Sequence, residues 1–135
     1  MQTRPIDAAD APAIPPGRAY AQALEVSGAQ RLLFVSGQTP ERADGSLPEG
    51  FAAQCRQAWA NVEAQLRAAG MTLDNLVKAT VFLADRADGV ANREVRRAVL
   101  GDRRIAMTVV VAGIFDERWL VEIEAVAAAG GPGPG

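Results

Sequence analysis

Apolar residues recur at steps of three and four between positions 51 and 69 of the chain. A period of about 3.6 residues predicts an amphipathic helix, and such a helix is stable only when other parts of the fold cover its apolar face. The apolar positions are Phe51, Cys55, Ala58, Trp59, Val62, Leu66 and Ala69. Ser46 and Glu49 have the spacing of a capping box before this helix, and Gly70 is placed to end it.

Strands that could pack on this apolar face are predicted from short runs rich in β-forming residues, at 20–26, 31–36, 76–83, 106–112 and 119–127. The first two runs are expected to form a hairpin, and the nearly continuous apolar run LLFVS predicts that the second is a central strand. In the last run, Val121 and Ile123 share one face and Glu122 and Glu124 the other. A second helix is predicted from Asp88 to Gly101.

These elements follow the order β-β-α-β-α-β-β and predict an α+β fold. Two helices in this order cover one face of a single mixed sheet and leave the second face partly apolar. Such a face requires a partner, and a closed symmetric oligomer would supply it.

The chain of 135 residues is long enough for one core, which we place at residues 17–128. We expect a flexible tail at residues 1–16 and a Gly/Pro-rich tail at 129–135. The sequence contains no run of about 18 apolar residues, and its start lacks the apolar stretch of a signal peptide. A cytoplasmic protein with no membrane partner is therefore expected.

Composition excludes several kinds of chemistry. The chain has no histidine and one cysteine, Cys55, so His-based nucleophile systems and structural zinc sites are excluded and no metal is expected. Its formal net charge of -2 gives no electrostatic basis for a nucleic-acid partner. Cys55 is predicted to pack in the core.

Four segments in order resemble the RidA/YjgF family of reactive-intermediate (enamine/imine) deaminases. They are 20–23 (YAQA), 33–38 (LFVSGQ), 76–83 (LVKATVFL) and 122–125 (EIEA). The resemblance spans about residues 17 to 127 and implies a chorismate-mutase-like fold, a homotrimer and small-molecule pockets at the subunit interfaces. It also implies hydrolysis of 2-imino or 2-enamino acids to 2-keto acids and ammonia, without a cofactor.

The chain departs from this family at the residue expected to hold the substrate carboxylate. The family places an arginine after Pro-Ala, and Met107 stands there in the stretch Arg104-Ile105-Ala106-Met107. A thioether cannot form the paired, charge-assisted hydrogen bonds that a guanidinium gives a carboxylate. The resemblance therefore identifies a divergent member, in which Tyr20, Gly37 and Glu122 are the family-site residues that remain.

Each candidate site residue has a structural alternative. Glu122 is expected to act as the proton-transfer carboxylate, and the alternative is a solvated position on an alternating strand. Gly37 suits either a close approach of another group or an unusual dihedral angle. Arg103 or Arg104 could replace the lost clamp, although charges in such loops are usually solvated. Trp119 is a candidate for the pocket mouth and Tyr20 for its lining.

The sequence thus favours a cofactor-independent enzyme that acts on a small imine or enamine, by hydrolytic deamination or by a related conversion such as cyclisation. Its activity on 2-imino acids is expected to be weak because of Met107. The alternative is a non-catalytic trimer that binds a metabolite in the interface pocket or regulates through it. Ribonuclease activity ranks third, because the chain is acidic and lacks histidine.

Overall fold

The structure, a computed structural model, describes residues 1–132 of the chain. Its elements are β1 (Gln2–Ile6), β2 (Ala23–Ser27), β3 (Arg31–Gln38), α1 (Phe51–Ala68), η1 (Leu73–Asn75), β4 (Leu76–Leu83), η2 (Arg86–Asp88), α2 (Gly89–Leu100), β5 (Ala106–Val111) and β6 (Val121–Ala129). The predicted α+β order is therefore confirmed from β2 onward, with one further strand, β1, before it. Of the tail expected at 129–135, Ala129 belongs to β6, and residues 133–135 lie outside the described residues.

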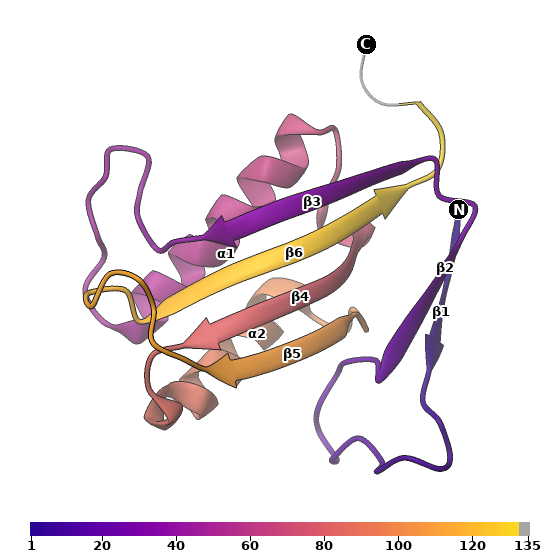
Figure 1. Cartoon of the computed structure of the whole chain (residues 1–135), viewed down its shortest axis with the longest axis horizontal. Helices are drawn as coiled ribbons and strands as arrows, with labels where there is room; N and C mark the ends of the chain where they lie inside the picture. The colour runs from indigo at the N-terminus through magenta and orange to yellow at the C-terminus, as the bar shows by residue number, and fades with distance from the viewer. Residues whose placement is uncertain (133–135) are drawn as a thin grey trace.

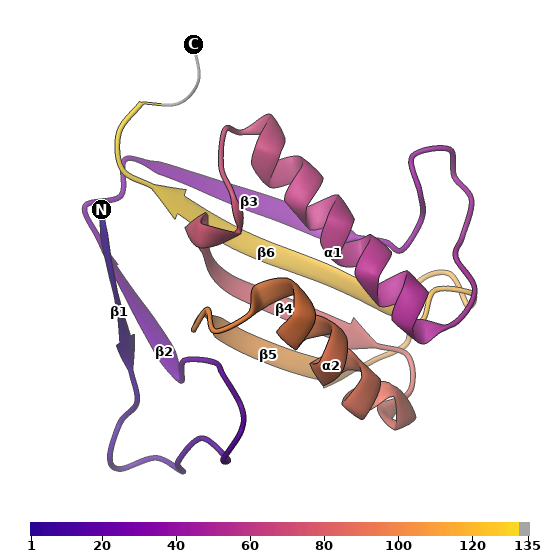
Figure 2. The ribbon, with the colours of Figure 1, turned by 180° about the vertical axis from the view of Figure 1, so that it is seen from behind.

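Four strands form the main sheet in the order β3-β6-β4-β5 (Figure 1). The β4–β5 pair is parallel, whereas β6 runs antiparallel to both β3 and β4, so the sheet is mixed as predicted. Both helices cover one face of this sheet (Figure 2), and no element of residues 1–132 covers the other, bare face, which Figure 1 shows. This arrangement confirms the expected two-layer architecture.

The core lies between the two helices and the sheet. Trp59, Val62 and Leu66 of α1 are fully buried, and so are Val121 and Ile123 on the inner face of β6. The predicted alternation along the last strand is confirmed, because Glu122 and Glu124 are on the opposite face. Gly70, with φ 70°, follows the last turn of α1 as expected.

Cys55 is fully buried within this core, as predicted. Burial raises the pKa of its thiol to about 12, because the thiolate would lose its hydration. The thiol lies 3.8 Å from Oδ1 of Asn92, a buried residue of α2. This contact links α1 to α2.

The bare face of the sheet is partly apolar, as predicted from the element order. Leu32 and Phe34 of β3 are 59% and 73% exposed on it, and Val110 of β5 is 39% exposed. Lys78, Glu122 and Glu124 alternate with these apolar residues on the central strands. Leu32 and Phe34, two positions apart on the same face, form an exposed apolar edge.

Two predictions about the first strands are wrong. β2 does not form a hairpin with β3, because β2 pairs with β1 in a separate two-stranded sheet. β3 is an edge strand and not a central one, since among residues 1–132 only β6 pairs with it. The continuous apolar run of β3 has a different cause, because Leu33 and Val35 pack under α1 while Leu32 and Phe34 face the bare side.

The N-terminal segment and the start of α1 also differ from expectation. Residues 2–6 belong to the expected tail, yet they form β1, and Arg4 pairs with Glu25 at 3.3 Å. No apolar period predicts this strand, because backbone pairing holds it and all five residues are exposed. Ser46 caps no helix, because its hydroxyl and its N–H both bind Oδ1 of Asp44 in a tight turn, and α1 begins after Gly50.

Candidate functional site

Glu122 and Gly37 are brought into direct contact across the β3–β6 pair. β3 has an irregularity between Val35 and Gln38, which places Gly37 beneath the side chain of Glu122. An ideal Cβ on Gly37 would lie 2.2 Å from Oε2 of Glu122 and 2.9 Å from its Cδ. The φ of Gly37 is not in the left-handed region, so the glycine is required by this close approach and not by an unusual dihedral angle.

The carboxylate of Glu122 is therefore not a freely solvated strand charge. The residue is half-buried, whereas Glu124, two positions along the same face, is exposed. Glu122 pairs across the sheet with Phe82 of β4. The missing side chain at Gly37 leaves room for the carboxylate to lie against the backbone of β3.

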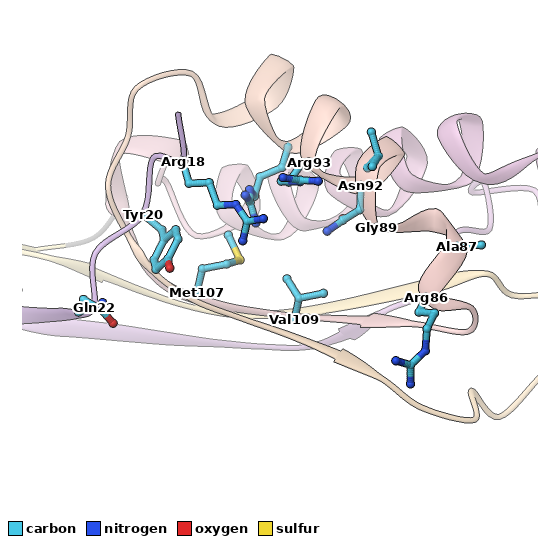
Figure 3. A pocket seen from close by; sticks show the side chains of 12 residues that line it. Arg18, Tyr20, Gln22, Arg86, Ala87, Gly89, Asn92, Arg93, Met107 and Val109 are labelled. Carbon is cyan, nitrogen blue, oxygen red and sulfur yellow. The ribbon is translucent and has the colours of Figure 1, made fainter. Parts of the chain in front are cut away.

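Tyr20 and Met107 meet on the other side of the sheet. The N–H of Ala21 donates to the carbonyl of Ile105 at 2.9 Å, and Ala21 bridges to Ala106, so Tyr20 is held beside the start of β5. Both Tyr20 and Met107 border a hollow of about 600 Å³ (Figure 3). This volume is in the range of small-molecule sites, about 300–1,000 Å³.

Arginines surround this hollow, and the sequence interpretation missed them. Arg93 and Arg96 of α2 line it together with Arg18 from the segment before β2 and Arg86 from η2. Arg93 and Arg96 are three residues apart, which places them on one face of α2. This spacing was the signal in the sequence for a cationic site. It is a weak signal, because arginines on a charged helix are solvated by default.

Burial and repulsion among these cations both act on Arg96. Burial is the main cause that lowers the pKa of Arg96, and the positive charges of Arg18 and Arg93 lower it further. The phenol of Tyr20 acts in the opposite direction. The hollow is therefore a cationic site whose floor carries the thioether of Met107.

The two groups of residues lie on opposite faces of one chain's sheet. Met107 pairs in register with Ala79, which is buried toward the helices. Glu122 pairs with Phe82, whose side chain is on the bare face, because neighbouring strand residues in register share a face. A single chain therefore does not assemble Glu122 and Met107 into one pocket.

The comparisons with known proteins come to one family. A family model described as Endoribonuclease L-PSP matches residues 10–129. A RutC family protein of Pyrococcus horikoshii is 34% identical over 110 residues, which cover 80% of this chain and 85% of that protein. The chain belongs to the RidA/YjgF family. A 2-iminobutanoate/2-iminopropanoate deaminase of Capra hircus is also similar, with 37% identity over 113 residues that cover 82% of this chain and 80% of the goat protein.

Solved structures of RidA/YjgF proteins share the fold. RidA from an Antarctic Psychrobacter superposes with a TM-score of 0.69 at 31% identity, over 93% of this chain and 99% of that one. A Rid family protein, YyfB from Yersinia pestis, gives 0.77 over 96% and 100% of the two chains, and at 24% identity it shows the fold alone. The chorismate-mutase-like fold expected from the resemblance is therefore confirmed.

Three other residues expected at a RidA-type site lie elsewhere. Arg104 binds Asp7 and the carbonyl of Tyr20, and it borders a separate hollow beside the N-terminal segment. Arg103 donates to Asp74 at 2.8 Å and to the carbonyl of Leu100. Neither lines the hollow of Met107, because each is engaged in holding a loop.

Trp119 is also separate from both groups. It is half-buried just before β6, and its indole Nε1 is buried with no hydrogen-bond partner among residues 1–132. The flanking backbone is held by Gln54 of α1, which accepts from the N–H of Leu120 at 2.8 Å and donates to the carbonyl of Arg118. Trp119 does not border the hollow of Tyr20 and Met107.

Within residues 1–132, no three His, Cys, Asp or Glu side chains are grouped so that they could hold a metal ion. Over the same residues, neither helix has the length and apolar character needed to cross a membrane. The site's chemical groups are thus one constrained carboxylate on the bare face and a cationic hollow with a tyrosine on the helix face.

Proposed function

We propose that this protein converts a small imine or enamine by acid–base catalysis with Glu122, at sites formed between the subunits of a homotrimer. The single observation that carries this proposal is the contact between Glu122 and Gly37, which places a carboxylate close against the backbone of β3 on the bare face. The resemblance keeps Glu122 as a family-site residue, and we expect it to transfer protons. The similar goat protein is named for the deamination of 2-imino acids.

The reaction needs little from the protein because a C=N carbon is already electrophilic. The Glu122 carboxylate accepts a proton from water as the oxygen adds to carbon, and it returns this proton to the nitrogen, which gives a carbinolamine. It then accepts the hydroxyl proton and delivers it to the nitrogen as the C–N bond breaks, so that a C=O bond forms and ammonia leaves. Imine and water thus become a carbonyl compound and ammonia, with no change of oxidation state and no cofactor. A positioned general base of this kind contributes about 10²- to 10⁴-fold to the rate.

The placement of the two groups of site residues supports a trimer. A second copy of the chain packed on the bare face would cover Leu32 and Phe34, which are otherwise exposed. The same packing would bring Glu122 of one subunit toward the Tyr20–Met107 hollow of its neighbour. This proposal explains why a family site is split between opposite faces of one chain.

Met107 sets the expected substrate preference. A thioether beside the hollow offers no hydrogen-bond donor to a carboxylate that is bonded directly to the C=N carbon. The protein is therefore expected to hydrolyse 2-iminopropanoate poorly. A related acid–base conversion, such as cyclisation of an enamine, would use Glu122 in the same way.

The test compares Glu122→Gln with Glu124→Gln, a control on the same face of the same strand. Imines are generated by an amino-acid oxidase, and semicarbazide traps what the protein leaves unhydrolysed. We expect turnover to fall by about 100-fold or more for Glu122→Gln and to stay near wild type for Glu124→Gln. Equal turnover by wild type and Glu122→Gln would refute the catalytic role.

The second candidate is a binding or regulatory trimer, and it is favoured by one observation. The hollow has binding groups but no carboxylate from its own chain beside Met107. A binding protein would retain its ligand in both variants and would turn over none of the imines. Location in the cytoplasm remains a prediction from the sequence.

A further inference from the structure

The hollow beside Met107 carries more positive charge than the chain itself neutralises. Among residues 1–132, four arginines line it, at positions 18, 86, 93 and 96, and none of the lining residues is acidic. The arginine ion pairs found within residues 1–132 involve other arginines, at positions 4, 103, 104 and 118. No side chain that lines the hollow offsets this charge, and a bound anion would do so.

The cost of this arrangement is concentrated at Arg96. Its side chain is partly buried, so it loses hydration, and it faces the positive charges of Arg18 and Arg93. Burying a charge without a counter-charge is unfavourable, and a bound anion would remove that cost. Guanidinium groups also present planar pairs of N–H donors, which match the two oxygens of a carboxylate.

The positions of the arginines around Met107 indicate how charge is arranged on the anion. Arg18 extends over the thioether of Met107, while Arg93 belongs to the helix wall of the same hollow (Figure 3). Arg86 lies at the far end of the hollow, beyond Val109 (Figure 3). Cations at both ends with an apolar floor between them match two negative groups joined by a short carbon chain.

We propose that this hollow binds a small dianionic ligand of the dicarboxylate type. Arg18, Arg93 and Arg96 hold one carboxylate, Arg86 holds the other, and Met107 contacts the carbon chain. This inference rests on the proposed function. Under that function, the substrate is an iminodicarboxylate. Arginines on α2 and before β2 then do the work that an arginine at position 107 would do for a smaller acid.

The test measures binding without catalysis, using the full chain and two keto acids. Titration calorimetry at fixed ionic strength compares 2-oxoglutarate, a dianion, with pyruvate, a monoanion. The variants are Arg93→Gln with Arg96→Gln, and separately Arg18→Gln, which lies outside the helices and leaves them intact. Arg56→Gln, an exposed position on α1, is the matched control.

We expect 2-oxoglutarate to bind about tenfold or more tightly than pyruvate, since charged hydrogen bonds are individually strong. The double variant and Arg18→Gln should each weaken its binding by about tenfold or more, and Arg56→Gln should leave it unchanged. Equal affinity for the two acids, or unchanged binding by both hollow variants, would overturn the proposal. So would loss of the oligomer in the double variant with ligand binding retained, because the arginines would then serve an interface.

A short RNA oligonucleotide serves as a competitor for the same site. The dicarboxylate proposal expects no displacement of 2-oxoglutarate at equal concentration, and displacement would overturn it in favour of a phosphate-binding surface. Glu122→Gln separates this proposal from the proposed function. If that variant and the wild type bind 2-oxoglutarate equally and neither hydrolyses any imine, the anion site stands and the enzyme proposal fails. If turnover depends on Glu122 but 2-oxoglutarate does not bind, the enzyme proposal stands and the anion site fails.

Discussion

Replacing Gly37 with alanine tests the position of the proposed catalytic carboxylate without changing the carboxylate itself. The added Cβ would lie 2.2 Å from Oε2 of Glu122, and ordinary contacts begin at 3.4 Å, so the carboxylate must move by about 1.2 Å. The Cδ and Cγ atoms, at 2.9 and 3.2 Å, would be displaced as well. A misplacement of about 1 Å in a reacting group costs roughly 100-fold in rate.

We therefore expect Gly37→Ala to lower kcat by about 100-fold in the semicarbazide assay. Its midpoint of thermal unfolding should change little, because the Glu122 side chain can swing toward solvent. Gly113→Ala is the matched control, since its Cβ meets nothing within 4 Å and its φ is not in the left-handed region. Full activity of Gly37→Ala alongside an inactive Glu122→Gln would show that the carboxylate works from a different position.

Three further changes test other parts of the structure. Phe34→Asp should dissociate the oligomer, because a buried Phe contributes about 1.5–3 kcal/mol; Phe115→Asp, a fully exposed loop position, should not, and light scattering measures both. Met107→Arg should raise kcat/KM for 2-iminopropanoate by about tenfold or more through a paired hydrogen bond, and no gain would show that position 107 is not the clamp site. The N–H of Gln22 and the guanidinium of Arg104 lower the pKa of Asp7, so its contribution to stability is present above its unfolded pKa and is lost as the pH falls through its folded pKa. Asp7→Asn should therefore be less stable than wild type at neutral pH in denaturant titrations, with the difference closing well below about pH 3.9; a difference independent of pH would refute this.

The parts of the fold that bury an apolar face were predictable from sequence. The period of Phe51, Cys55 and Trp59 predicted α1 and its buried side, and the limits of β4 were predicted at 76–83. β1 was not predictable, because it contributes backbone hydrogen bonds and one exposed ion pair, neither of which leaves an apolar pattern. β3 was wrongly predicted to be a central strand. Its apolar run includes Phe34, which is exposed on a face that one chain cannot cover.

The candidate site was predictable only in part for a similar reason. The contact of Gly37 with Glu122 agrees with the family motif, and Tyr20 does lie beside Met107. Arg104 was chosen because it is close to Met107 in sequence, but successive strand and loop residues point in different directions, and it binds Asp7. Arg93 and Arg96 come from a helix distant in sequence, and only the packing of α2 over β5 brings them to Met107.

Mixed trimers test directly whether Glu122 of one subunit acts at the Met107 hollow of another. Glu122→Gln and Met107→Trp, which fills the hollow, are each purified, unfolded, mixed in equal amounts and refolded, and imine hydrolysis is measured. If the site is shared, each mixed trimer contains one intact site, and activity should return to about a quarter of the wild-type value. Activity no higher than that of the two separate variants would contradict a site built from two subunits.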